Sequence, residues 1–200
     1  MKQAIIISIL LFALEGCTTR SVSNTQRTAI EQLLLSGAVD NALSKVQLPQ
    51  LDGAKIYLDF SNLQGYDIEY IKSAVKAQMA ENGSIIVEKI EVADYMVEVS
   101  CGGFGNEYKE SLLGIPALPV PGSPLSLPEL SLLKGVEQDG IIKLFIVVYA
   151  DGDVVSANHY YGKAERDERF FLWMRSQPKD DIREAWEKAD EESKIKQESL

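Results

Sequence analysis

The sequence predicts an α/β (α+β) fold, in which a mixed sheet of about five strands is flanked by helices and carries a long Pro-rich apolar loop. Three observations support this prediction. The chain has 200 residues, of which 46% are hydrophobic and 25% charged, so it can form a packed core. Stretches with helical spacing alternate with stretches in which every second residue is apolar. Five of the seven prolines fall between residues 111 and 133.

The N-terminal residues have the pattern of a secretory signal peptide, predicted over residues 1–16. Lys2 precedes an apolar stretch, Ala4–Leu14, that is too short to span a bilayer. Leu14-Glu15-Gly16-Cys17 resembles the lipobox of bacterial lipoproteins, although Glu15 stands where a small or hydroxyl residue is usual. The alternative is a buried N-terminal strand or helix with an ordinary cysteine.

The lipobox resemblance implies that Cys17 is the first residue of the mature protein. Its thiol would carry a diacylglycerol and its amine an acyl group such as palmitate, and several chains at one residue give lasting attachment. Thr18 follows in place of an aspartate, which by analogy with enteric bacteria implies delivery to the outer membrane. We expect the anchored protein to face the periplasm. Residues 17–25 would form a lipidated tether that reaches only ~28 Å, so the domain must lie close to its membrane.

Residues 26–175 are predicted to form a single α/β domain that begins with an amphipathic helix. Thr28 and Glu31 have the spacing of a capping box, and Pro49 ends the helical region. The apolar face of this helix consists of Ile30, Leu33, Leu34, Ala38, Ala42, Leu43 and Val46.

A strand, a second helix and two further strands follow. Residues 55–60 alternate as a strand, and Asp67 is predicted to cap a helix that ends at Asn82-Gly83. Residues 84–90 and 93–103 are the next two strands. The glycines of Cys101–Gly105 are expected to let the last of these strands bend into a loop.

The C-terminal part is predicted to contain a hairpin and a charged helix. Residues 140–164 contain two strand-like stretches around Asp151-Gly152-Asp153, a turn signal. Residues 176–200 form a charged segment with a helix over residues 180–193.

The stretch from Ser111 to Leu133 is the least usual of the sequence. Its one charged residue is Glu129, and its length would suit a membrane span. Prolines at this density forbid a regular helix, so we predict a stiff, extended or polyproline-like arm. Three interpretations remain open: an arm packed on its own sheet, a docking surface for a second copy or a partner, and a contact with the membrane interface. The predicted interaction residues are Leu112, Leu113, Ile115, Pro116, Leu118, Pro119, Pro121, Pro124, Leu125, Leu127, Pro128 and Leu130.

Charge and motifs exclude several function classes. The formal net charge of -10 argues against nucleic acid as a partner and against a polybasic contact with anionic lipids. The sequence has no serine-hydrolase elbow, no zinc-protease His pair and no phosphate loop. No cofactor and no metal site are predicted, and we expect that the protein is not an enzyme.

His159, the pair Asp151 and Asp153, and Cys101 are the remaining candidate site residues. His159 is the only histidine; it lies in a strand pattern, and nothing in the sequence supports the geometry of a catalytic triad around it. Asp151 and Asp153 lack the later ligands of a calcium loop, which favours a plain turn. With Cys17 acylated, Cys101 would have no partner in the chain, and we interpret it as a small buried residue.

Three sequence blocks carry a family resemblance. The stretch CTTRSVSNTQRTAIEQLLLSGAVDNAL, the stretch VADYMVEV and the stretch ESLLGIPALPVP resemble an uncharacterised group of bacterial lipoproteins. The architecture is also similar to the curli-secretion channel subunit, to the Pel polysaccharide-export lipoprotein and to periplasmic activators of penicillin-binding proteins. A short tether suits the export proteins better than the activators, which must reach across the cell wall.

The sequence therefore predicts a non-enzymatic outer-membrane lipoprotein that oligomerises or docks within a cell-envelope assembly, one for export. Its partners would be the membrane, through Cys17, and a second copy or another envelope protein. The alternative is a monomeric ligand-binding or regulatory lipoprotein whose arm covers a pocket.

Overall fold

The computed structural model describes residues 17–21, 28–65, 67–119, 122, 126–172 and 174–198. Contacts divide the chain into two compact units. Unit 1 contains residues 1–25, 107–138 and 166–180, and unit 2 contains residues 26–106, 139–165 and 181–200. Three long strands, β4 (Tyr95–Ile115), β7 (Leu130–Ala150) and β8 (Asp153–Phe171), contribute residues to both units.

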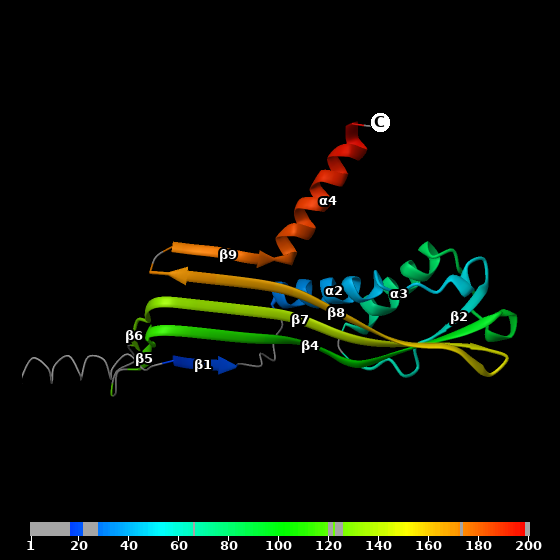
Figure 1. Cartoon of the computed structure of the whole chain (residues 1–200), viewed down its shortest axis with the longest axis horizontal. Coiled ribbons are helices and arrows are strands. Elements are labelled where there is room, and N and C mark those ends of the chain that lie inside the picture. Colours follow the sequence, from blue (N-terminus) through cyan, green and yellow to red (C-terminus); the bar gives the residue numbers. More distant parts are fainter. Residues whose placement is uncertain are drawn as a thin grey trace, which may run out of the picture. The chain divides into compact units, whose positions relative to one another are not determined.

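Unit 2 contains the helices of the described chain and a mixed sheet in the order β3-β2-β4-β7-β8 (Figure 1). Strand β2 (Lys55–Asp59) is parallel to both β3 (Ile85–Ile86) and β4. The helices are α2 (Ala29–Leu43), α3 (Ile68–Glu81) and α4 (Asp181–Glu198), with short 3-10 helices at Pro49–Leu51 and Ile90–Val92. The predicted α+β class with a mixed sheet is confirmed, but within the described residues the main sheet has seven strands where about five were predicted.

Helix α2 begins where the sequence predicts. The Thr28 hydroxyl accepts a hydrogen bond from the Glu31 amide at 3.3 Å, and the Glu31 carboxylate accepts one from the Thr28 amide at 2.7 Å. These two bonds satisfy donors that a helix N-terminus leaves free. Helix α3 also begins as predicted after Asp67, but Asp67 has a φ of 52° and its side chain makes no capping hydrogen bond.

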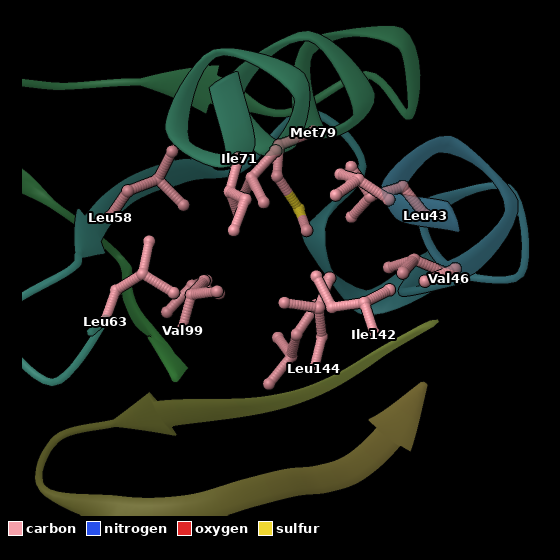
Figure 2. Close-up of a cluster of buried hydrophobic side chains, with 14 of the residues drawn as sticks. Leu43, Val46, Leu58, Leu63, Ile71, Met79, Val99, Ile142 and Leu144 are labelled. Carbon is pink, nitrogen blue, oxygen red and sulfur yellow. The ribbon is translucent and has the colours of Figure 1, made fainter. Parts of the chain in front are cut away.

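The core of unit 2 lies between these two helices and the sheet (Figure 2). Met79 and Ile71 of α3 point toward Ile142 and Leu144 of β7, and all four side chains are buried. Leu43 and Val46 close the core on the α2 side, as the predicted apolar face of this helix requires. Fully burying one such aliphatic side chain contributes about 1.5–3 kcal/mol, so this cluster is a major source of stability for unit 2.

The predicted hairpin around Asp151 and Gly152 is confirmed. Strand β7 ends at Ala150 and β8 begins at Asp153, and the two residues between them have φ values of 52° and 88°. Two consecutive left-handed residues form the turn that matches the twist of antiparallel strands.

Unit 1 is an antiparallel sheet in the order β1-β4-β7-β8-β9 (Figure 1). Strand β1 (Cys17–Ser21) pairs with residues 109–113 of β4, and β9 (Met174–Asp180) pairs with the end of β8. Between β4 and β7, the short strands β5 (Leu118–Pro119) and β6 (Ser126–Leu127) form a second antiparallel pair.

Several predicted boundaries are corrected by the structure. The strand predicted over residues 84–90 is reduced to Ile85–Ile86, and the C-terminal helix extends to Glu198. Cys101–Gly105 remains within β4 and does not bend into a loop, because β4 keeps pairing with β7. Residues 17–21 of the predicted tether form a strand, so this part of the segment is fixed along β4.

Candidate interaction surface of unit 1

The predicted arm, residues 111–133, is the end of a long β-hairpin. Its first residues complete β4, its last residues begin β7, and Leu118 pairs with Leu127 between them. The described residues are extended, as predicted, and strand pairing holds them in that form. Pro121, Pro124 and Leu125 lie outside the described residues.

The interaction residues predicted for the arm differ in exposure. Leu112 is 6% exposed, which corrects its prediction as a surface residue, because alternate residues of a strand face opposite sides of the sheet. Leu113 is half-buried. The exposed members are Ile115, Pro116, Leu118, Pro119, Leu127, Pro128 and Leu130.

A groove of about 840 Å³ crosses the sheet of unit 1. The floor contains small residues, because Ser111 of β4 lies opposite Gly135 of β7, with the Ser111 hydroxyl 3.5 Å from the Gly135 carbonyl oxygen. Ser176 of β9 pairs with Arg169 of β8 and extends the groove to the other edge.

One end of the groove is apolar. Phe171 and Met174 are paired across β8 and β9, and both line the groove together with Leu113 and Leu133. The exposed fraction is 50% for Phe171 and 55% for Met174. The groove therefore joins an apolar end to a floor of serine and glycine, with Glu137 and Asp167 also in its lining.

An ion cluster centred on Lys134 lies beside the arm. The Lys134 ammonium is 2.7 Å from a Glu110 carboxylate oxygen and 3.1 Å from one of Glu129. Hydrogen bonding to Glu110, together with that to Glu129, raises the pKa of Lys134 against the opposing effect of burial. Burial first, and then the Glu110 charge, raises the pKa of Tyr108, whose hydroxyl donates to Glu110 at 3.1 Å. Glu129, the one charge of the arm, is thus ion-paired with a lysine that it shares with Glu110.

A second ion cluster holds β8 and β9 together. One oxygen of Glu168 lies 2.6 Å from Arg166 and 2.7 Å from Arg175, and it accepts a hydrogen bond from Gln177 at 3.2 Å. Arg166 also lies 3.6 Å from Asp180. These contacts fix the register of an edge strand that has few buried apolar residues.

Cys17 begins β1, with its Cα paired with that of Leu113. For Cys17 the structure describes the backbone pairing and not the side chain that the predicted lipidation would modify. The backbone pairing places Cys17 near the end of β4 from which the arm continues.

The remaining candidate residues are dispersed in unit 2. His159 is exposed and stacks on Phe145 with the ring centroids 4.4 Å apart, while Cys101 is half-buried and packs against the core. Burial raises the pKa of the Cys101 thiol. Asp151 lies in the β7–β8 turn, and no group of three or more metal-ligating side chains occurs among the residues with described positions. Within the described ranges, no helix is both long and apolar enough to cross a membrane.

The chain matches a protein family over most of its length. Residues 11–156 match the family described as "Family of unknown function (DUF6655)". No curated protein matches the sequence. The matched region includes Cys17, the arm and most of unit 2, and it ends within β8.

Proposed function

The chain belongs to the DUF6655 family, and we propose that it is a non-enzymatic outer-membrane lipoprotein that acts as an oligomerising or docking component of a cell-envelope assembly, one for export. The observation that carries this proposal is the arrangement of unit 1. An open antiparallel sheet with a partly apolar groove begins at the residue that has the sequence pattern of a lipid attachment site.

Lipid attachment at Cys17 would restrict where the protein can work. Residues 17–21 pair with β4, so little free chain would separate the acyl groups from unit 1. A protein held in this way stays at its membrane and meets partners there. This supports membrane-associated export assemblies over partners across the cell wall.

The groove is the part of unit 1 best suited to bind a protein. It combines exposed apolar side chains with a floor of small residues, and charged groups surround it. Protein interfaces commonly have an apolar centre and a polar rim. We propose a second copy or another envelope protein as the occupant.

Two experiments test the parts of this proposal. Replacing Cys17 by Ser in cells should release the protein from membranes and abolish the mass added by acylation, whereas Cys101→Ser should change neither. For docking, the size of a soluble chain that starts at Thr18 is measured by light scattering. We expect an oligomer that dissociates in the double variant Leu113→Ser/Leu133→Ser and persists in Val154→Ser, an exposed position of unit 2. A monomer that Leu113→Ser/Leu133→Ser leaves unchanged would remove self-assembly from the proposal.

A monomeric ligand-binding function is the second candidate, and the groove volume supports it. A volume of about 840 Å³ lies within the range of small-molecule pockets. Of the predicted arm, however, Ser111, Leu112, Leu113 and Leu133 are the described residues that line the groove, so they form a wall and not a cover. Saturable binding of an apolar fluorophore by the monomer, lost in Phe171→Ser, would favour this function.

A further inference from the structure

We propose that one end of unit 1 inserts into the membrane interface beside the acyl chains of Cys17. This apolar end consists of Ile115, Leu118, Leu127, Leu130, Leu172 and Met174. The inference rests on the lipid attachment proposed above and adds a second, reversible membrane contact made by the fold itself.

The register of β1 places the attachment point at this end. Cys17 pairs with Leu113, and β4 ends two residues later at Ile115. A strand advances about 3.3 Å per residue, so Ile115 lies about 7 Å beyond the level of Cys17. The pair Leu118–Leu127 continues the hairpin from there.

A second apolar segment lies at the same end. The Leu172 amide donates a hydrogen bond to the Leu132 carbonyl oxygen at 3.0 Å, so the β8–β9 turn lies beside the start of β7. The sequence of this turn, Phe170-Phe171-Leu172-Trp173-Met174, has no charge. The six residues of the apolar end come from both segments, and their exposed fractions lie between 40% for Leu172 and 61% for Leu130.

Leu172 has a backbone conformation that is unfavourable for leucine. Its φ is 53°, in the left-handed region that glycine and asparagine adopt more readily. Neither a backbone preference nor burial in the core explains an exposed leucine in this conformation. A requirement for an apolar side chain at this position would explain both the unfavourable φ and the exposure.

The charge distribution favours lipid over water at this end. The one carboxylate of the arm, Glu129, is ion-paired with Lys134, which it shares with Glu110, while the whole chain has a net charge of -10. An acidic protein is repelled by anionic headgroups, and an uncharged surface is the part that can approach them. Interfacial insertion reaches about 5–10 Å, a depth that suits a hairpin end.

The prolines reduce the cost of bringing this backbone into the interface. Unpaired amides are costly in an apolar medium, and proline has no amide hydrogen. Pro116, Pro119 and Pro128 are all exposed members of the hairpin end. Pairing of β5 with β6 satisfies further backbone groups.

The test measures the membrane depth of a single tryptophan in the anchored mature chain. A maleimide-bearing phospholipid is coupled to Cys17, with Cys101→Ala to prevent a second attachment and with Trp173→Phe and Trp186→Phe to remove background emission. The anchor is therefore present whether or not cells acylate Cys17. The reporters are Leu127→Trp and Met174→Trp, one on each apolar segment, and the matched control is Lys109→Trp. Lys109 is an exposed residue of unit 1 that pairs with Ser21, about 13 Å along β1 from Cys17.

In phosphatidylcholine vesicles whose acyl chains carry bromine, we expect both reporters to be quenched at least about twofold more strongly than the control, because bromine quenches tryptophan only at short range and inserted reporters reach the acyl boundary. Equal quenching of reporters and control would overturn the inference. Emission that shifts to the blue with protein concentration, without added quenching, would also overturn it and would assign this end to a second copy. If Cys17 proves not to be acylated in cells, this contradicts the proposed function and leaves the membrane inference testable, because the quenching experiment attaches its own lipid anchor.

Discussion

The carbonyl oxygen of Ala38 in α2 and the Cα of Gly162 in β8 approach so closely that a Cβ on Gly162 would lie 1.8 Å from this oxygen. The same helix approaches Gly140 of β7, where a Cβ would lie 2.3 Å from the Leu34 carbonyl oxygen. Two glycines on neighbouring strands thus let α2 pack with its backbone directly on the sheet.

Replacing Gly162 by Ala should destabilise unit 2. The methyl group would meet helix backbone, which cannot rotate away as a side chain can, so α2 must shift. We expect a loss of about 3 kcal/mol in the free energy of unfolding, at the upper end of typical overpacking costs. Urea denaturation followed by circular dichroism measures this loss. Gly103→Ala is the control, because a Cβ there meets nothing within 4 Å, and equal stability of the two variants would contradict the packing described.

Shortening Leu144 to Ala should leave a cavity in the core of unit 2. Leu144 is fully buried between the sheet and the two helices (Figure 2). We expect a loss of about 2–5 kcal/mol, as for other buried Leu→Ala substitutions. Val154→Ala, at an exposed position of β8, should change the denaturation midpoint little.

Replacing Thr28 by Ala should weaken the start of α2. The variant loses the hydroxyl that accepts the Glu31 amide, and we expect a cost of about 1 kcal/mol. Ser36→Ala, which removes a hydroxyl inside the same helix, should not lower stability. Amide hydrogen exchange in the first turn of α2 measures the effect locally, and unchanged protection at Glu31 would count against this cap.

Replacing Lys134 by Met should destabilise unit 1. The substitution leaves Glu110 and Glu129 without their shared cation, and charged hydrogen bonds of this kind contribute about 1.5–3 kcal/mol. Lys134→Arg, which keeps the charge, should retain most of the stability. If hydrogen exchange of the β7 amides is the same in Lys134→Met as in the unsubstituted chain, the cluster contributes little to the stability of unit 1.

The same lysine predicts a loss of stability in alkaline solution. Its pKa is raised above 10.5 in the folded chain by Glu110 and Glu129. The folded state therefore binds this proton more tightly than the unfolded state. The resulting contribution to the free energy of unfolding is fully present below pH 10.5 and is lost as the pH rises through the folded-state pKa. We expect the alkaline decrease in melting temperature to be smaller in Lys134→Met, and an identical pH profile in both chains would contradict this.

Local signals explain which parts of the fold could be predicted. The Thr28–Glu31 cap, the strand at residues 55–60 and the Asp151-Gly152 turn each depend on a few adjacent residues, and all are confirmed. The length of β4 could not be predicted, because residues 101–110 lack the alternation that one buried face imposes. Pairing with β1 and β7 keeps this part of β4 extended although its sequence does not alternate.

The groove could not be predicted from the sequence. Ser111, Gly135 and Ser176 are distant in the sequence and have no distinctive pattern, and the strand registers bring them to one surface. The apolar composition of the arm did indicate an unusual surface, because it is a property of one continuous segment. Its hairpin form depends on partners that composition does not specify.

The discontinuous composition of unit 1 has a consequence for the order in which the chain can fold. Its sheet consists of three separate segments, and β1 pairs with β4, a strand that lies much later in the chain. Until β4 arrives, β1 has no template, and until β9 arrives, β8 is an open edge in this unit. Sheets closed by such distant pairings form slowly and expose unpaired strands meanwhile. A chaperone that shields extended segments should therefore raise the yield of unit 1 on refolding.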